Sequence, residues 1–121
     1  FLQRKKIKEI VDKDFLKLNG EFTVMEAIER FKNAKCSEGY LIDKKNKLLN
    51  KISLPDLLNY DINKKINDIK KVKFLKINEN EDLSTTIEKC KEFVGESIPV
   101  VSEKGKIIGI FSENDLTAIP A

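Results

Sequence analysis

The residue types best suited to chemistry occur twice at one spacing: Ser53 with Asp56, and Ser112 with Asp115. A serine three residues before an aspartate is typical of a capping box, in which both side chains satisfy amides of a helix's first turn. The same geometry suits a ligand, because helix N-terminal amides attract phosphate and a carboxylate accepts two hydrogen bonds from a ribose diol. Both interpretations stay open, since a duplication copies caps as well as sites.

The rest of the composition argues against catalysis. The chain has no histidine, and Cys36 and Cys90 stand far apart with no partner at metal-ligand spacing. These facts exclude the commonest metal sites, histidine-based triads and acid–base pairs. We therefore expect no enzyme, no catalytic residue, no metal and no required cofactor. Both thiols are expected to be small buried groups in a reducing cytoplasm.

The charge is nearly balanced, with 23 basic against 20 acidic residues. A nucleic-acid binder would need a patch of one sign and interleaved aromatic residues, so we expect no nucleic-acid partner. The lysine clusters are interpreted as solvated surface.

No apolar run approaches the roughly 18 residues that cross a bilayer. The chain begins with Phe1, so we expect the natural protein to extend further toward its N-terminus. The basic cluster at residues 4–6 also suits a cytoplasmic stretch beside a membrane.

The chain repeats itself when it is shifted by 59 positions, without a gap. Residues 15–17 fall on the identical residues 74–76, and residues 56–57 fall on the identical 115–116. Chance does not keep this register over so long a stretch, so the chain contains two copies of one unit. The copies are expected to span residues 7–60 and 61–121.

Each copy has the pattern of a βαββα unit. Copy one predicts a strand at 15–18, a helix at 23–35, and strands at 40–42 and 47–52 around a polar turn. Copy two predicts a strand at 72–77, a helix that Asp82 caps, with Val94 at the end of its apolar stripe, and strands at 98–101 and 106–111. A short helix is expected to begin at Ser53 and at Ser112, and helical turns at 7–11 and 66–69. One unit buries too little core alone, so we expect an α/β (α+β) fold of two pseudo-symmetric repeats packed sheet to sheet.

With this pattern in hand, the chain resembles a tandem pair of CBS domains, also called a Bateman module. The likeness is carried by the motif Ile98-Pro99-Val100-Val101 and by the stretch from Gly105 through Gly109 and Ser112 to Asp115. Two positions of copy one depart from the family pattern. Asn50 stands where the family has a glycine, which predicts a left-handed turn that asparagine tolerates, and Tyr40 replaces the proline that copy two keeps.

The resemblance implies two adenosyl-ligand pockets, each with an aspartate that holds the ribose. The first would contain Val11, Leu16, Cys36, Ser37, Glu38, Ile110, Ser112 and Asp115. The second, less favoured, would contain Lys70, Leu75, Glu96, Ser97, Ile98, Pro99, Ile52, Ser53 and Asp56. In the second pocket Lys51 or Lys70 would offset Glu96, whereas Glu38 in the first has no obvious basic partner. These charges favour AMP or ADP over ATP as the regulatory ligand.

The resemblance also implies a regulatory role within a larger protein. CBS pairs regulate chloride channels, magnesium transporters, nucleotide-synthesis enzymes and kinases, and this chain is similar to the cytoplasmic tails of bacterial chloride channel family proteins. We therefore expect a cytoplasmic domain that senses adenine nucleotides for a transporter or channel. The alternative is a ligand-free assembly module. In either case we expect a homodimer through the helices, with Leu57, Leu58 and Leu116 at the interface.

Overall fold

The computed structural model describes residues 7–91 and 96–112. The chain divides into two compact units, one formed by residues 15–74 and the other by residues 1–14 together with 75–121. They are named here the first repeat and the second repeat, and each is described by itself.

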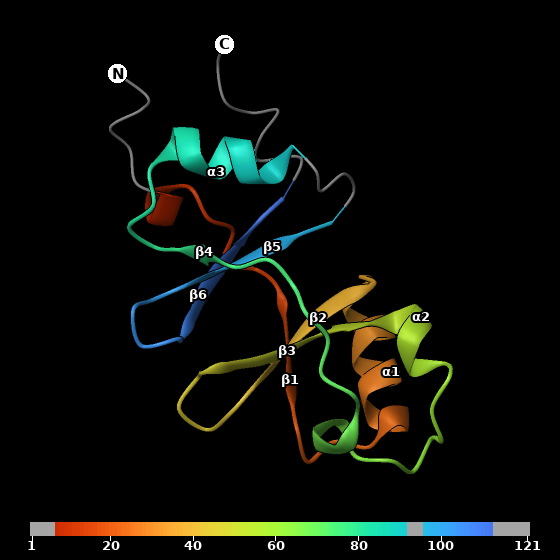
Figure 1. The fold of residues 1–121 in the computed structure, drawn as a ribbon. Coiled ribbons are helices and arrows are strands. Elements are labelled where there is room, and N and C mark those ends of the chain that lie inside the picture. The colour runs from red at the N-terminus through yellow and green to blue at the C-terminus, as the bar shows by residue number, and fades with distance from the viewer. Residues whose placement is uncertain (1–6, 92–95, 113–121) are drawn as a thin grey trace. The chain divides into compact units, whose positions relative to one another are not determined.

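The first repeat is a three-stranded sheet with helices, coloured orange to green in Figure 1. Its elements are β1 (Leu16–Asn19), α1 (Val24–Ala34), β2 (Glu38–Ile42), β3 (Leu48–Ser53), α2 (Leu54–Leu57) and the 3₁₀ turn η3 (Ile66–Asp68). The sheet order is β1-β2-β3, with β1 parallel to β2 and β2 antiparallel to β3. This is the predicted βαββα order.

Local sequence explains where α1 begins and ends. Thr23 accepts a hydrogen bond from the amide of Glu26, whose side chain accepts one from the Thr23 amide in return, which completes a capping box. The helix ends at Lys35, whose left-handed backbone (φ 53°) lets its amide reach the carbonyls of the last turn. The buried side of α1 carries Val24, Ala27 and Phe31, at the spacing of one helix face.

The described part of the second repeat has the same strand-helix-strand-strand order. Its elements are η2 (Ile7–Glu9), β4 (Ile77–Asn78), α3 (Leu83–Cys90), β5 (Ile98–Val101) and β6 (Ile107–Phe111). The sheet order is β4-β5-β6, with a parallel and then an antiparallel pair. Asp82 caps α3 by accepting from the Thr85 amide, as predicted. The predictions on Val94, and on the helix that begins at Ser112, lie outside the described residues.

Each repeat has its own hydrophobic core. The core of the first contains Leu18, Val24, Ala27, Phe31, Leu41, Ile52, Leu57, Ile66 and Ile69. The core of the second contains Ile7, Ile77, Leu83, Cys90, Ile98, Val100 and Phe111. The turn η2 therefore packs with the second repeat although it precedes the first in sequence, and its Ile7 amide donates to the Glu81 carbonyl at 3.3 Å.

Two local predictions were wrong. The strand expected at residues 72–77 is only Ile77–Asn78, because residues 71–73 are exposed and pairing with β5 begins only at Ile77. Asn50 does not form a left-handed turn. It lies within β3, and the described non-glycine residues with positive φ are Lys35 and Asn46.

No helix in the described part of the chain has the length and apolarity needed to span a membrane.

Candidate functional site

The first Ser-x-x-Asp motif forms a helix cap in the first repeat. Ser53 is the last residue of β3 and has an extended backbone (φ −106°, ψ 145°). Its hydroxyl accepts a hydrogen bond from the Asp56 amide at 3.3 Å. Pro55 in the first turn lacks an amide hydrogen that would otherwise be unsatisfied there. The predicted cap at Ser53 is therefore confirmed, and it leaves the Asp56 side chain exposed.

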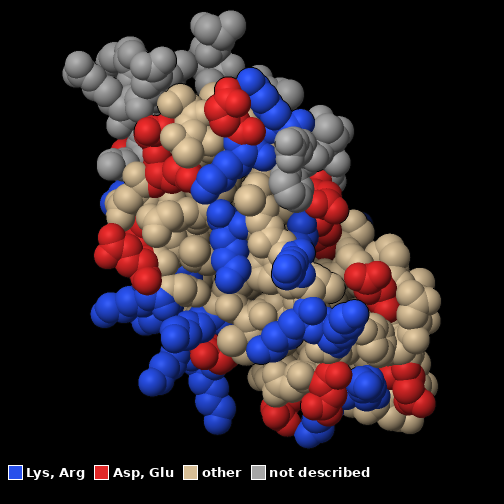
Figure 2. Space-filling model, viewed as in Figure 1, with Lys and Arg blue, Asp and Glu red and all other residues tan. Residues whose placement is uncertain are grey.

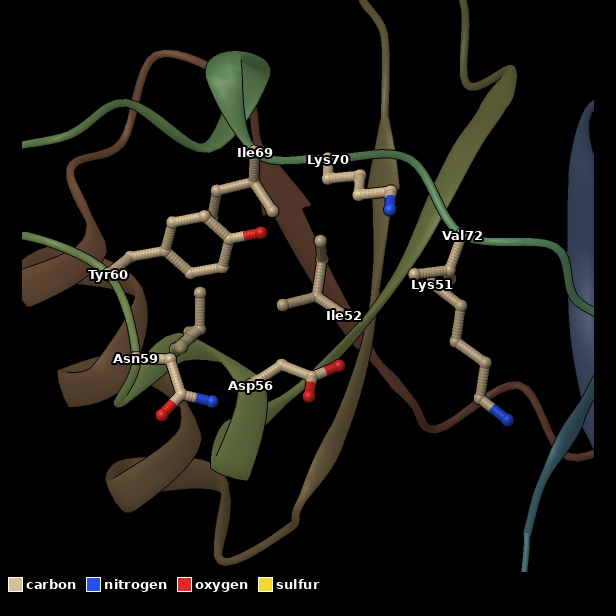
Figure 3. Close-up of a pocket in the computed structure, with 9 residues that line it drawn as sticks. Lys51, Ile52, Asp56, Asn59, Tyr60, Ile69, Lys70 and Val72 are labelled. Atoms are coloured by element: carbon tan, nitrogen blue, oxygen red, sulfur yellow. The ribbon is translucent and has the colours of Figure 1, made fainter.

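Asp56 lines a hollow of about 250 Å³ that lies wholly within the first repeat (Figure 3). The walls come from the end of β3, from α2 and the residues after it, and from the segment after η3. The lining residues are Lys51, Ile52, Asp56, Leu57, Asn59, Tyr60, Ile69, Lys70 and Val72. Small-molecule sites usually occupy roughly 300–1,000 Å³, so this hollow suits part of a nucleotide.

The lining is apolar inside and polar at its edge. Ile52, Leu57 and Ile69 are buried core residues. Figure 3 shows the Tyr60 ring beside Ile69 and facing Ile52, with the Asp56 carboxylate nearby. A planar apolar ring could pack against such a surface while its hydroxyl substituents reach the carboxylate acceptor.

Three of the nine residues predicted for the second pocket line this hollow: Ile52, Asp56 and Lys70. Ser53 lies next to them as the helix cap. The other five belong to the second repeat: Leu75 packs against its core, Glu96 and Ser97 precede β5, and Ile98 and Pro99 are buried in β5.

The sequence interpretation missed most of the remaining lining. Tyr60 lies three residues beyond the end of α2, so helix periodicity did not indicate it. Ile69 and Val72 were missed because their segment was assigned to a helical turn and a strand.

The charge prediction for the first pocket was wrong. Glu38 does have a basic partner, since Lys51 Nζ lies 2.8 Å from its carboxylate, and their side chains are only 13% and 23% exposed. The antiparallel register pairs Tyr40 with Lys51 and Glu38 with Ser53, so Glu38 and Lys51 are diagonal neighbours across β2 and β3. Lys51 is thus held by Glu38, and its side chain points away from Tyr60 in Figure 3. Lys70 is the other cation of the lining.

The residues predicted for the first pocket lie in both repeats. In the first repeat, Leu16 pairs with Gly39, the Cys36 thiol donates to the Glu38 carbonyl at 3.5 Å, and the Ser37 carbonyl accepts from the Leu54 amide.

In the second repeat, Val11 lies beside Gly109, Ile110 pairs with Asp12, and Ser112 follows β6. Asp115, the predicted ribose ligand of this pocket, lies outside the described residues.

Charged side chains of both signs are interspersed on the face shown in Figure 2. One exposed ion pair joins Lys65 and Glu21 at 2.8 Å, and Lys65 lowers the pKa of the Glu21 carboxyl through a hydrogen bond and its charge.

The structure thus consists of two similar units of sheet and helix, and comparison with known proteins identifies the family. The model of the CBS domain matches residues 7–63 and again residues 66–120. The chain therefore belongs to the CBS domain family and carries a tandem pair, as the resemblance indicated.

Three proteins illustrate the likeness. The uncharacterized protein MJ1004 of Methanocaldococcus jannaschii is 25% identical over 116 residues, which cover 92% of this chain and 54% of the relative. Its crystal structure has a TM-score of 0.79 at 26% identity and covers 93% of this chain and 58% of that one. This chain thus spans little more than half the length of that relative.

The cytosolic domain of the Mg²⁺ channel MgtE in complex with ATP has a TM-score of 0.77 at 21% identity, covering 88% of this chain and 45% of that one. The protein CBSX2 in complex with AMP has a TM-score of 0.78 at 20% identity, covering 93% of both chains. Likeness at this level of identity confirms the fold.

Proposed function

We propose that this CBS pair is the cytoplasmic regulatory region of an ion-transport protein, that it binds an adenine nucleotide, and that it carries out no catalysis. The observation that carries the proposal is the hollow of the first repeat, where the exposed Asp56 carboxylate stands beside the apolar surface of Ile52, Tyr60 and Ile69. Two proteins of the same fold are described in complex with ATP and AMP.

In this proposal Asp56 accepts the hydroxyl hydrogens of the ribose, and Tyr60 packs against the base. Lys70 is the cation available for phosphate, because Lys51 is paired with Glu38. Among the described residues that line the hollow, Lys70 is the lysine not paired with Glu38, and a single cation suits AMP or ADP better than a triphosphate. A nucleotide would regulate the host protein only to the extent that it binds one arrangement of the module more tightly than another.

The larger protein that contains this CBS pair is also part of the proposal. The sequence favoured a chloride channel family protein, whereas one neighbour of the same fold belongs to a Mg²⁺ channel. The shared class, an ion-transport protein, is what we propose.

The decisive experiment is isothermal titration of the whole chain with AMP, ADP, ATP and S-adenosylmethionine. Asp56→Ala should weaken binding of the preferred nucleotide by about 1.5–3 kcal/mol, the usual worth of hydrogen bonds to a charged acceptor. Asp61→Ala is the matched control, because Asp61 is also exposed, its carboxylate accepts from a nearby turn amide, that of Asn63, and it lies outside the pocket lining.

The absence of detectable binding of any of the four compounds at millimolar concentration would refute nucleotide sensing. If Asp115→Ala abolishes binding while Asp56→Ala leaves it intact, the nucleotide occupies the pocket that the sequence favoured. If Ser53→Ala and Asp56→Ala lower only the melting temperature, the motif is a cap and the structural interpretation holds.

A second candidate function, dimer assembly through the helices, is favoured by exposed apolar side chains. Leu58 is 68% exposed after α2, and Met25 and Ile62 are also exposed, with the Met25 amide bonded to the Ile62 carbonyl at 3.0 Å. Leu57 cannot take the interface role expected of it, because it is fully buried in the first core. Light scattering that shows a monomer at high micromolar concentration would exclude assembly, and Leu58→Glu should weaken a dimer if one forms.

A further inference from the structure

Asn50 is a buried polar residue that the nucleotide-binding proposal does not use. It is 1% exposed and occupies an inward-facing position of β3, between the apolar residues Leu48 and Ile52. An amide at such a position costs free energy unless its polar atoms are hydrogen-bonded. Its presence there therefore requires specific partners.

The distant partners of Asn50 are backbone groups at positions 20 and 22 residues further along the sequence. Its Nδ2 donates to the Lys70 carbonyl at 3.3 Å, and its Oδ1 accepts from the Val72 amide at 3.1 Å. The same Oδ1 also accepts from the neighbouring Lys51 amide at 3.0 Å. One carboxamide thus joins β3 to the segment that follows η3.

That segment and β3 supply adjacent walls of the hollow. Ile69, Lys70 and Val72 line one side, and Lys51 and Ile52, the two residues after Asn50, line the other. Residues 70–76 belong to no regular strand or helix, so strand pairing does not fix the first of these walls.

In the second repeat, the corresponding segment is joined to its strand by backbone hydrogen bonds and not by a side chain. Gly109 corresponds to Asn50, and the segment at Val11 and Asp12 lies so close that a Cβ on Gly109 would be 2.7 Å from Val11 Cγ2. Reciprocal backbone hydrogen bonds of 2.9 Å join Asp12 to Ile110. In the second repeat the segment pairs directly with the strand, and in the first the Asn50 carboxamide is inserted between them.

We propose that Asn50 is a positioning residue for the nucleotide pocket, because its carboxamide holds the segment of Lys70 and Val72 at the distance from β3 that keeps the hollow open. The role in binding rests on the proposed function. The role in holding the segment does not, so the two are tested by separate measurements.

The first measurement needs no ligand and follows amide hydrogen exchange by NMR in the whole chain. Asn50→Ala removes the acceptor, so the Val72 amide should exchange at least about tenfold faster, while the Ile110 amide keeps its protection. Asn50→Asp retains the acceptor and should keep Val72 protected. Asn46→Gly is the control, because it removes an asparagine side chain from the preceding turn at a position where a left-handed backbone suits glycine.

The second measurement is AMP titration of the same variants. Asn50→Ala and Asn50→Gly should each weaken AMP binding roughly tenfold, the loss expected when a hydrogen-bonded wall is no longer held, and Asn46→Gly should not. Val72 exchange that stays at the wild-type rate in Asn50→Ala would overturn the proposal. So would faster exchange with unchanged AMP affinity, provided that Asp56→Ala does reduce affinity. If wild-type protein binds no AMP, nucleotide sensing fails, and with it the role of Asn50 in binding, whereas the exchange data still decide whether Asn50 holds the segment.

Discussion

The two repeats fill corresponding core positions with side chains of opposite size. Phe31 of α1 corresponds to Cys90 of α3, and Gly39 of β2 corresponds to Ile98 of β5. In the first repeat the helix supplies the bulk, since a Cβ on Gly39 would lie 3.2 Å from Phe31 Cζ. In the second repeat the strand supplies it and the helix carries the small thiol. All four positions are buried.

A third pair completes the exchange. Ile52 of β3 pairs with Gly39, and its counterpart Phe111 of β6 pairs with Ile98. Each repeat therefore places one phenylalanine in this part of its core, from the helix in one case and from the last strand in the other. Protein interiors are packed at a nearly constant density. The side chains at the three corresponding positions (31, 39 and 52 in the first repeat; 90, 98 and 111 in the second) must therefore fill the space together, and the size of each depends on the other two.

The largest expected effect comes from breaking this arrangement in the first repeat. Phe31→Cys should lower the free energy of unfolding by about 3 kcal/mol, because it removes a buried ring and leaves a cavity. Adding Gly39→Ile, which completes the helix-strand pair of the second repeat, should recover at least about 1 kcal/mol of that loss. Urea unfolding of the two single variants and the double variant gives the coupling energy. If the unfolding free energies lost by the two single variants add up to the loss of the double variant, the two positions do not share one space.

A smaller effect is expected at Gly109 of β6, which lies against the backbone and side chain of residues 11–12. Gly109→Ala should cost about 1–3 kcal/mol, because the new Cβ would approach the Asp12 carbonyl oxygen to 2.9 Å and the Val11 side chain to 2.7 Å. Gly39→Ala should cost less, since its three nearest atoms belong to side chains at 3.2 Å that can shift. Unfolding by urea compares the two, and equal losses would contradict the distinction between backbone and side-chain contacts.

The sequence predicted the elements that depend on local signals and failed where an element depends on pairing with a distant strand. Periodicity predicted α1 and the strands β2, β3, β5 and β6 to within about two residues at each end, and the capping residue Asp82 predicted the start of α3, because these signals are local. The segment before β4 was misassigned, since alternating lysines and apolar residues imitate a strand whether or not a neighbouring strand pairs with it. Pairing is a property of the whole fold.

The candidate site was predictable in part. Asp56, Ile52 and Lys70 followed from the motif and the resemblance, and they do line one hollow. The interactions of Asn50 were not predictable, because they join residues far apart in the chain. The Glu38–Lys51 pair was not predictable from the hairpin either, because the register shifts between Leu41 and Ile42, and only the shifted register makes these positions diagonal neighbours.

The two cysteines offer the mildest test of the difference between the repeats. Cys90 is buried in the second core, and this burial, followed by the charge of Glu81, raises the pKa of its thiol. Cys36 is half-buried at the end of α1 and bonds to the Glu38 carbonyl. Because the thiolate is the reactive form, iodoacetamide at neutral pH should label Cys36 several-fold faster than Cys90. Peptide mass spectrometry over time measures both rates, and equal rates in folded protein would contradict the burial of Cys90.

The pKa shift of Cys90 also predicts a dependence of stability on pH. A folded pKa above the ordinary value of 9.0 means that the folded state keeps the thiol proton to higher pH than the unfolded chain does. The resulting stabilisation is fully present below pH 9.0 and is lost as the pH rises through the folded pKa. Cys90→Ala removes the thiol. The difference in unfolding free energy between wild type and variant should therefore be constant below pH 9.0 and should narrow as the pH rises from 9.0 through the folded pKa. Urea unfolding from neutral to alkaline pH measures this difference, and Cys36→Ala provides the control for general alkaline effects. A difference that stays constant throughout the alkaline range would mean that the Cys90 thiol ionises no less readily in the folded repeat than in the unfolded chain.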